Sequence, residues 1–220
     1  MKKAARLLLL LPLLCPCLSA ADKPNIIYIM LDDAGYGDVS CYGQKNFKTP
    51  NVDALAAGGL KFTQHYSGST VCAPTRCCLM TGLHTGHAFV RGNREVKPVG
   101  QSPIPGDTVT VAKLLKRNGY RTGAFGKWGL GNPGSEGDPV NQGFDEFYGY
   151  NCQRNAHTYY PTWLYHNLEK VKLDGKTYAH DLIMTEALSF IRKNKDGPFF
   201  CYLPWTIPHA SMHVPEKYTA

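Results

Sequence analysis

The sequence lacks the features that mark a membrane-spanning or disordered protein. After its first 20 residues, it has no apolar run approaching the roughly 20 residues that a membrane-spanning helix needs. It contains no internal repeats and no low-complexity tracts, and 43% of its residues are hydrophobic against 19% charged. A chain of 220 residues with this composition is expected to bury one sizeable core and to be soluble.

The chain also has no strong charge of either sign. Its formal net charge of +7 falls to +4 without the first 20 residues, because these contain three basic residues and no acidic ones. There is no stripe of lysine and arginine with interleaved aromatic residues, which argues against a nucleic-acid partner. The mild positive balance that remains fits an anionic substrate.

Cysteines are present, but they lack the spacing of a disulfide scaffold or a zinc site. Two of the eight lie in the first 20 residues, and the others are Cys41, Cys72, Cys77, Cys78, Cys152 and Cys201. Their irregular spacing excludes a small disulfide framework, and the adjacent pair does not have the two-residue spacing that zinc sites use. Disulfide pairing is left open.

The first 20 residues are typical of a secretory signal peptide. Lys2, Lys3 and Arg6 form a basic start, Leu7–Leu14 an apolar segment, and Leu18–Ala21 a small-residue cleavage site. Such a segment is too short to span a membrane. We therefore expect residues 1–20 to be removed, and the mature chain to be exported to the periplasm or the extracellular space.

The mature chain alternates between strand-like and helix-like segments. Asn25–Leu31 is a continuous apolar run that predicts a strand buried on both faces. The other expected elements are strands at Leu60–Tyr66, Tyr120–Phe125 and Phe199–Leu203, helices at Thr49–Gly59, Asp107–Gly119 and His180–Asn194, and a loop at Asn132–Tyr150. This alternation predicts an α/β fold, with a mostly parallel sheet covered by helices on both faces.

Two adjacent carboxylates follow the first of these strands. Asp32 and Asp33 come directly after the apolar run, where open α/β sheets place their ligands. Adjacent like charges are costly unless a cation neutralises them, and carboxylate oxygens suit a hard ion such as Ca²⁺ or Mg²⁺. A solvated turn without any ligand also fits these residues, but their position favours a metal site.

A second candidate lies at the start of a predicted helix. A loop rich in serine, glycine and threonine leads to Cys72; Pro74 marks the start of the helix and Gly82 its end. Cys72 then lies beside free backbone N–H groups and the positive end of the helix dipole, which favour an anion and a reactive thiol. Arg76, one turn further on, adds a donor suited to sulfate or phosphate. A structural cysteine beside a surface arginine fits the same residues.

Two more polar residues follow predicted strands. Lys127, flanked by glycines, and His209 are expected at the same carboxyl edge of the sheet as Asp32 and Asp33. Several candidates converging on one edge indicate a site more strongly than any one of them. His157 is a candidate for the lining of a substrate pocket, although a structural histidine explains it as well.

Several segments together carry a family resemblance. They are Cys72–Arg76 followed by Leu79–Gly82, and also Asp32–Asp38, Thr49–Asn51 with Ala56–Gly59, Gly126–Trp128 and Pro208–Ala210. In sequence and order they resemble the type I sulfatases of the alkaline-phosphatase-like superfamily, and arylsulfatases in particular. The resemblance covers essentially the whole mature chain. It implies that residues 21–220 are the N-terminal part of a sulfatase catalytic domain, which hydrolyses a sulfuric ester.

The resemblance also implies an unusual nucleophile and a metal ion. A formylglycine-generating maturation enzyme would oxidise Cys72 to Cα-formylglycine, whose hydrated aldehyde attacks the sulfur of the ester and then releases sulfate. Asp32, Asp33 and the modified residue 72 would bind Ca²⁺, with Mg²⁺ the less suitable ion. The partners that follow are this enzyme and a sulfated small molecule or glycan.

Three basic side chains receive roles from the same resemblance. Arg76 would stabilise the formylglycine, and Lys127 would bind the sulfate oxygens. His209 would contact the ester and protonate the leaving oxygen. His157 would join Lys127 and His209 in binding the substrate.

Three features depart from the family pattern. Thr75 replaces the commoner serine and keeps its hydroxyl. Gly129 stands where many relatives carry a histidine that contacts the formylglycine, a role that is then absent or supplied elsewhere, with His157 as the candidate. The sequence stops at Ala220, before a second pair of metal ligands, another lysine and a small C-terminal domain of the relatives. We therefore expect an N-terminal portion with weak or no activity by itself.

The sequence leaves other functions open. A phosphoester or phosphonate hydrolase of the same superfamily would use the same kind of metal-backed nucleophile. A non-catalytic protein that binds sulfated glycans fits Gly129 and the early stop. Aromatic residues between Tyr148 and Trp163 are candidates for stacking on a sugar or aryl group, and secretion fits a sulfated polysaccharide as substrate.

Overall fold

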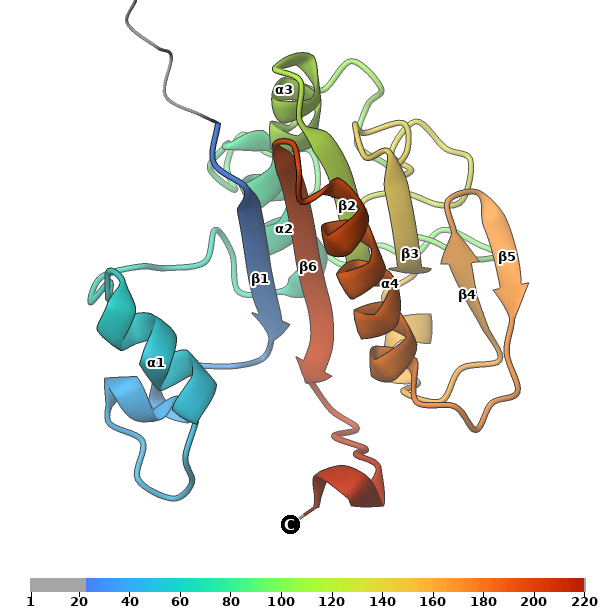
Figure 1. Cartoon of the computed structure of the whole chain (residues 1–220). Helices are drawn as coiled ribbons and strands as arrows, with labels where there is room; N and C mark the ends of the chain where they lie inside the picture. Colours follow the sequence, from blue (N-terminus) through green and yellow to red (C-terminus); the bar gives the residue numbers. More distant parts are fainter. Residues whose placement is uncertain (1–22, 220) are drawn as a thin grey trace, which may run out of the picture.

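A computed structural model describes residues 23–219, so the signal peptide expected at residues 1–20 lies outside the described residues. In this part of the chain the strands form one six-stranded sheet, in the order β1-β6-β2-β3-β4-β5 (Figure 1). The strands are β1 (Ile26–Asp32), β2 (Arg121–Lys127), β3 (Glu146–Tyr150), β4 (Trp163–His166), β5 (Glu169–Lys172) and β6 (Phe199–Pro208).

The sheet is mostly parallel, as predicted. Strand β6 runs parallel to both β1 and β2, and β2 runs parallel to β3. Only β4 and β5 are antiparallel, as a hairpin at one edge of the sheet. The carboxyl ends of β1, β2, β3 and β6 therefore meet at the lower edge of the sheet in Figure 1.

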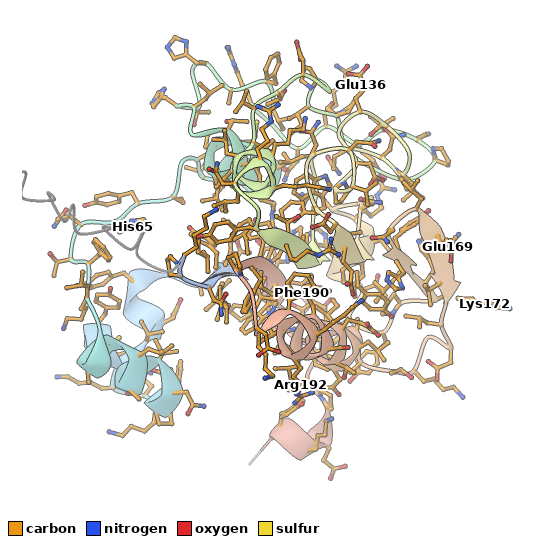
Figure 2. All side chains as sticks on the ribbon, turned by 45° about the horizontal axis from the view of Figure 1, so that its top comes forward. His65, Glu136, Glu169, Lys172, Phe190 and Arg192 are labelled. Carbon is orange, nitrogen blue, oxygen red and sulfur yellow. The ribbon has the colours of Figure 1, made fainter. Side chains whose placement is uncertain are left out.

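Helices cover both faces of the sheet, which confirms the α/β prediction (Figure 1). The helices are α1 (Pro50–Gly58), α2 (Cys72–Thr81), α3 (Val111–Arg117) and α4 (Ala179–Asn194). On one face, Phe190 of α4 is buried against the sheet with Phe125, whereas Arg192 of the same helix is exposed (Figure 2). On the other face, Cys77 of α2 belongs to a buried cluster with Trp128. No helix within residues 23–219 combines the length and apolarity needed to cross a bilayer.

Helix α2 begins earlier than its proline suggests. It begins at Cys72, with Val71 in an extended conformation just before it, so Pro74 lies inside the first turn. Proline is tolerated there because the first N–H groups of a helix have no partner within the helix. The helix ends as predicted at Gly82, whose left-handed φ of 68° lets its N–H donate to the carbonyl of Cys78.

The prediction that the first strand is buried on both faces is wrong for this structure. β1 is an edge strand that pairs only with β6 among the described residues. Its side chains alternate, and those of Ile27, Ile29 and Leu31 are 49%, 46% and 39% exposed. Apolar residues occupy both faces of this strand, but the described residues cover only one face.

The strand predicted at Leu60–Tyr66 is also absent. These residues form no hydrogen-bonded ladder, and their side chains are exposed. Alternation of side chains cannot by itself make a strand, because the backbone N–H and C=O groups need a neighbouring strand.

Two elements lie where no strand was predicted. The end of the expected loop at residues 132–150 forms β3, in which Gly149 (φ 152°) packs on the backbone of Gly126. The β4–β5 hairpin turns at Asn167, whose φ is 53°. Strand β5 reads Glu-Lys-Val-Lys and so carries almost no apolar signal.

Candidate functional site

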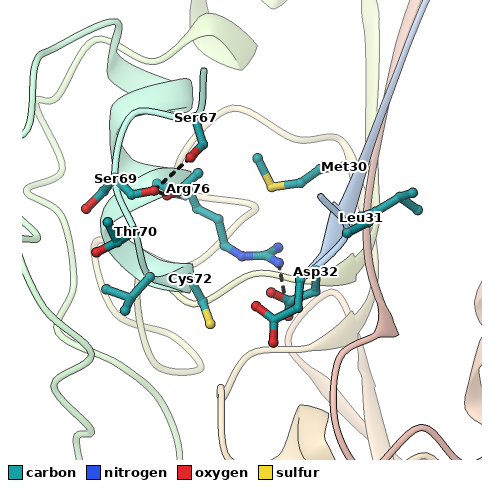
Figure 3. A pocket seen from close by; sticks show the side chains of 12 residues that line it. Met30, Leu31, Asp32, Ser67, Ser69, Thr70, Cys72 and Arg76 are labelled. Carbon is teal, nitrogen blue, oxygen red and sulfur yellow. Dashed lines mark hydrogen bonds and ion pairs between the residues drawn. The ribbon is translucent and has the colours of Figure 1, made fainter. Parts of the chain in front are cut away.

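Cys72 opens helix α2 at the carboxyl edge of the sheet. It is partly buried and lines a cavity of about 240 Å³, together with Asp32, Asp33 and Arg76. Figure 3 shows the sulfur of Cys72 and the carboxylate of Asp32 pointing toward each other across this space. The helix N-terminus predicted from the sequence is therefore turned toward the end of β1.

The N-terminus of α2 is fixed by its surroundings. The backbone N–H of Ala73 donates to Oδ1 of Asn93, 3.0 Å away. The hydroxyl that Thr75 keeps in place of serine donates to the carbonyl oxygen of Ser69 at 2.6 Å. These bonds tie the helix start to the loop before it and to the segment around Asn93.

Lys127 links the carboxylate and the sulfur. It ends β2 and is completely buried, with its Nζ 2.6 Å from Oδ2 of Asp32 and 3.4 Å from Sγ of Cys72. Arg76 is buried too: its Nη2 lies 3.6 Å from the same oxygen of Asp32, and its Nη1 donates to the backbone carbonyl of Lys127. Buried charges are tolerated when paired in this way.

Asp33 and His209 form the exposed side of the site. His209 follows β6 directly, and its Nε2 lies 3.4 Å from Oδ2 of Asp33. Asp33 has a left-handed φ of 63°, which aspartate adopts more readily than most residues. A carboxylate oxygen of Asp32, Sγ of Cys72 and a ring nitrogen of His209 all lie within 4.8 Å of one another.

His157 reaches the same edge from a different segment. It lies in a short 3-10 helix (Asn155–His157), and its ring stacks on that of His209, with centroids 4.4 Å apart and planes inclined by 10°. Partial burial lowers the pKa of His157, and the nearby Lys127 and His209 lower it further, against the opposing effect of Asp32 and Asp33.

The structure thus brings together all the residues that the sequence singled out for the site. They come from the end of β1, the start of α2, the end of β2, the 3-10 helix and the end of β6: Asp32, Asp33, Cys72, Arg76, Lys127, His157 and His209. The six cysteines of the described chain are all unpaired.

The residues fit a hard cation once position 72 carries oxygen in place of sulfur. Both ion pairs of Asp32 use Oδ2, which leaves Oδ1 for a metal ion. Asp33 adds a second carboxylate on the solvent side. Oxygen ligands of this kind suit Ca²⁺, whereas a thiol does not.

Sequence reasoning missed Tyr159. Its hydroxyl shares its single hydrogen between the carbonyl oxygen of Thr206, 3.0 Å away, and that of His209. Burial, followed by the effect of Tyr178, raises the pKa of Tyr159 to about 12. Its position two residues after His157 was the only available signal.

Gln153 was missed as well. Gly129 has a φ of 85°, and a Cβ atom there would lie 1.6 Å from Nε2 of Gln153. The Gln153 side chain, 4% exposed, therefore occupies the space that a side chain at position 129 would need. Nothing in the local sequence connects these two positions.

Most of the aromatic residues that were candidates for stacking on a sugar or aryl group are buried in the core. Tyr148, Tyr150 and Tyr159 are only 6%, 1% and 3% exposed. Tyr160 and Trp163 are partly exposed, and Trp163 is covered by the ammonium of Lys170, 4.2 Å from its ring centroid. Stacking on a substrate is therefore restricted to a smaller set than the sequence suggested.

The chain is an α/β protein in which acidic and basic side chains meet at the carboxyl edge of a mostly parallel sheet, the edge where such sheets place their ligands. Residues 24–220 match the family model described as Sulfatase, and the chain belongs to this family. It is arylsulfatase-like: human arylsulfatase D is 42% identical to it over 152 residues, which are 65% of this chain and 26% of that protein.

Solved structures agree with this assignment. The crystal structure of Ps i-CgsB superimposes with a TM-score of 0.76 at 34% identity, covering 89% of this chain and 48% of that one, and the same protein has been solved with k-i-k-neocarrahexaose. The structure of BT4656 with its substrate D-glucosamine-2-N,6-O-disulfate has a TM-score of 0.71 at 31% identity, covering 86% and 35%. The chain thus spans about half or less of the length of these relatives.

Proposed function

We propose that this chain forms the part of a sulfatase that carries the nucleophile for hydrolysis of a sulfate ester. The nucleophile would be a formylglycine made from Cys72. The observation that carries this proposal is the buried Lys127 ammonium, which contacts both Asp32 and Sγ of Cys72 at the N-terminus of α2. This ammonium places a positive charge beside the atom that would attack a sulfate group, at the positive end of the α2 dipole.

The modified residue would supply the nucleophile: one hydroxyl of its hydrated aldehyde would attack the sulfur and displace the alcohol. The other hydroxyl would then lose its proton and expel sulfate, which restores the aldehyde. Lys127 would bind the sulfate oxygens and stabilise their developing negative charge, and Arg76 would stabilise the formylglycine. His209, on the solvent side, would bind the ester and give a proton to the leaving alcohol oxygen.

We include a resident Ca²⁺ in this proposal, held by Asp32, Asp33 and the oxygen of the modified residue 72. When bound, the ion would polarise the sulfate oxygens and the attacking hydroxyl. The two carboxylates and the cations Lys127 and Arg76 balance each other in charge. A bound dication would then leave the site positive, as an anionic ester requires.

For the substrate we propose a sulfated glycan or small molecule. The support comes from two structural relatives above 30% identity, which were solved with k-i-k-neocarrahexaose and with D-glucosamine-2-N,6-O-disulfate. We also propose that the protein is exported after removal of residues 1–20, and that its maturation needs a formylglycine-generating enzyme.

Production together with such an enzyme tests the proposal. Mass spectrometry of the peptide containing Cys72 should show a loss of about 18 Da, from replacing the thiol by an aldehyde. Turnover by the converted chain, which we expect to be weak because the chain spans only part of its relatives, should be faster with an aryl sulfate than with an aryl phosphate and should be absent in C72A.

The competing functions predict other results. A faster reaction with the phosphate would favour a phosphoester hydrolase. An unmodified thiol that binds sulfated glycan without turnover would favour a binding protein. Either result would overturn the proposed sulfatase activity.

A further inference from the structure

His209 has little regular structure to hold its ring. It lies one residue beyond β6, in a bend, with its side chain 19% exposed. The carboxylate of its ion-pair partner Asp33 is 65% exposed, and exposed ion pairs fix geometry weakly. A residue that must present one ring nitrogen to a substrate needs a firmer support than this.

The support comes from the segment at His157–Tyr159. The ring of His157 lies flat on that of His209, with centroids 4.4 Å apart and planes inclined by 10°. The contact uses the face of the His209 ring, while Nε2 points toward Asp33 and Nδ1 lies against the carbonyl oxygen of Ala210. Both nitrogens therefore lie outside the stack.

Hydrogen bonds tie the same segment to the backbone around His209. The hydroxyl of Tyr159 lies between the carbonyl oxygens of Thr206 and His209, which share its single hydrogen. In return, Oγ of Ser211 donates to the carbonyl oxygen of His157 at 3.3 Å. The loop is therefore held on both sides of His209, and the stack fixes the remaining freedom of the ring.

We propose that His157 is a positioning residue that holds the imidazole plane of His209, so that a ring nitrogen stays within reach of Cys72 and Asp32. This inference rests on the proposed function, since it assigns His209 a part in sulfate ester hydrolysis. The positioning role replaces the direct substrate binding that the family resemblance implied for His157. Partial burial lowers the pKa of His157, which favours the neutral form of its ring in the stack.

Variants of His157 separate positioning from direct substrate contact. H157A removes the flat ring, whereas H157F keeps the ring and removes its nitrogens. We expect H157A to lower kcat about 10-fold to 100-fold with little change in KM, and H157F to recover most of that loss. The losses should grow as the leaving alcohol becomes less acidic, because leaving-group protonation then matters more.

A double-mutant cycle tests whether His157 acts through His209. Adding H157A to H209A should cost little beyond H209A alone, because the ring to be positioned is already gone. H166A is a matched control, since His166 also packs against an aromatic ring. It lies on β4, and its ring meets that of Tyr148 edge-on. H166A should leave the rate unchanged.

Two results would overturn the positioning role. Equal losses in H157A and H157F would show that the nitrogens of His157 matter, as in direct substrate binding. Additive losses in the cycle would show that His157 acts independently of His209. If H157A does not fold, Y159F loosens the same loop and should also lower kcat more than it raises KM.

A readout without turnover keeps this inference separate from the proposed function. In ¹³C-labelled histidine spectra of the full chain, the ring resonances of His209 should move in H157A and stay close to wild type in H157F. A shift in a protein without sulfatase activity would retain the positioning and reject the function. An unchanged His209 signal in H157A would reject the positioning.

Discussion

At the scale of single residues, the site depends on a buried network of opposite charges. Asp32 has two cationic neighbours within 3.6 Å, of which Lys127 is the nearer at 2.6 Å. Removing one partner of a buried ion pair leaves an uncompensated charge, which costs more than the pair itself contributes.

K127M should therefore destabilise the metal-free protein by about 3–5 kcal/mol, because the Asp32 carboxylate stays buried with only Arg76 beside it. Urea unfolding in the presence of a chelator measures the change. The double variant K127M/D32N removes both charges and should recover much of the loss. Strictly additive effects would mean that the 2.6 Å contact is not an energetically coupled pair.

Gly129 gives a second prediction at this scale. G129A should lower the free energy of unfolding by about 1–3 kcal/mol, since its Cβ would overlap Gln153 and its φ is 85°. G129A/Q153A should regain part of this. Gly134, with φ 77° and nothing within 4 Å of its Cβ position, is the matched control: G134A has only the backbone strain. Thermal or urea unfolding of the wild type and the three variants measures these changes. Equal losses of stability in G129A and G134A would contradict the clash.

Much of the candidate site could be predicted from the sequence, because position follows from simple rules. Asp32 and Lys127 end strands that proved to be parallel, and His209 directly follows another. Cys72 precedes a proline and a helix-ending glycine. The residues that contact and position this site were not predictable. The stack of His157 on His209 and the packing of Gln153 against Gly129 join segments whose approach depends on the whole fold.

At the scale of elements, α4 and β6 pack around His180, which is harder to protonate in the folded protein than in the unfolded chain. His180 of α4 packs edge-on against Trp205 of β6, with ring centroids 5.0 Å apart. Burial lowers the pKa of His180 in the folded protein, while Asp181 opposes the shift. The folded protein therefore binds fewer protons here than the unfolded chain.

The protein should consequently become less stable as the pH falls below about 6.5, the ordinary histidine value. For this one group, the slope cannot exceed about 1.4 kcal/mol per pH unit. Urea unfolding between pH 7.5 and 5 measures it, and H180F should make the curve flatter in this range. His157, whose pKa is also lowered, should account for part of the remaining slope. A pH dependence that H180F leaves unchanged would contradict the shift at His180.

Elements were predictable where apolar periodicity and capping agreed. α4 and β6 carry strong signals, and both lie where expected, although β6 continues to Pro208. The β4–β5 hairpin was not predictable, since β5 has the sequence of an exposed edge strand. Residues 60–66 show the converse, because alternation without a neighbouring strand leaves them unpaired.

At the scale of the whole molecule, one flank stands out as apolar. Strand β1 has no neighbour on its outer edge among the described residues, and its outward row is Ile27, Ile29 and Leu31. Nearby in Figure 1, α1 exposes Leu55 at 72%. An edge strand with an apolar face is prone to associate with another chain.

The 220-residue chain, produced as such, should therefore self-associate in a concentration-dependent manner. The double variant I27K/I29K should reduce this association, because it places two charges on the outward row of β1. Sedimentation velocity over a range of concentrations measures it. L168K changes an exposed leucine on the β4–β5 turn and should have no effect. A wild-type chain that stays monomeric at every concentration would refute the prediction.

The strands that carry the site constrain where such a protein can change during evolution. Asp32, Lys127 and His209 are placed by β1, β2 and β6, three adjacent strands held about 4.8 Å apart by backbone hydrogen bonds that do not depend on side chains. The β4–β5 hairpin lies at the far edge of the sheet and shares none of those bonds. Insertions and substitutions can therefore accumulate there under selection for new substrates, while the spacing of the charged residues is inherited unchanged.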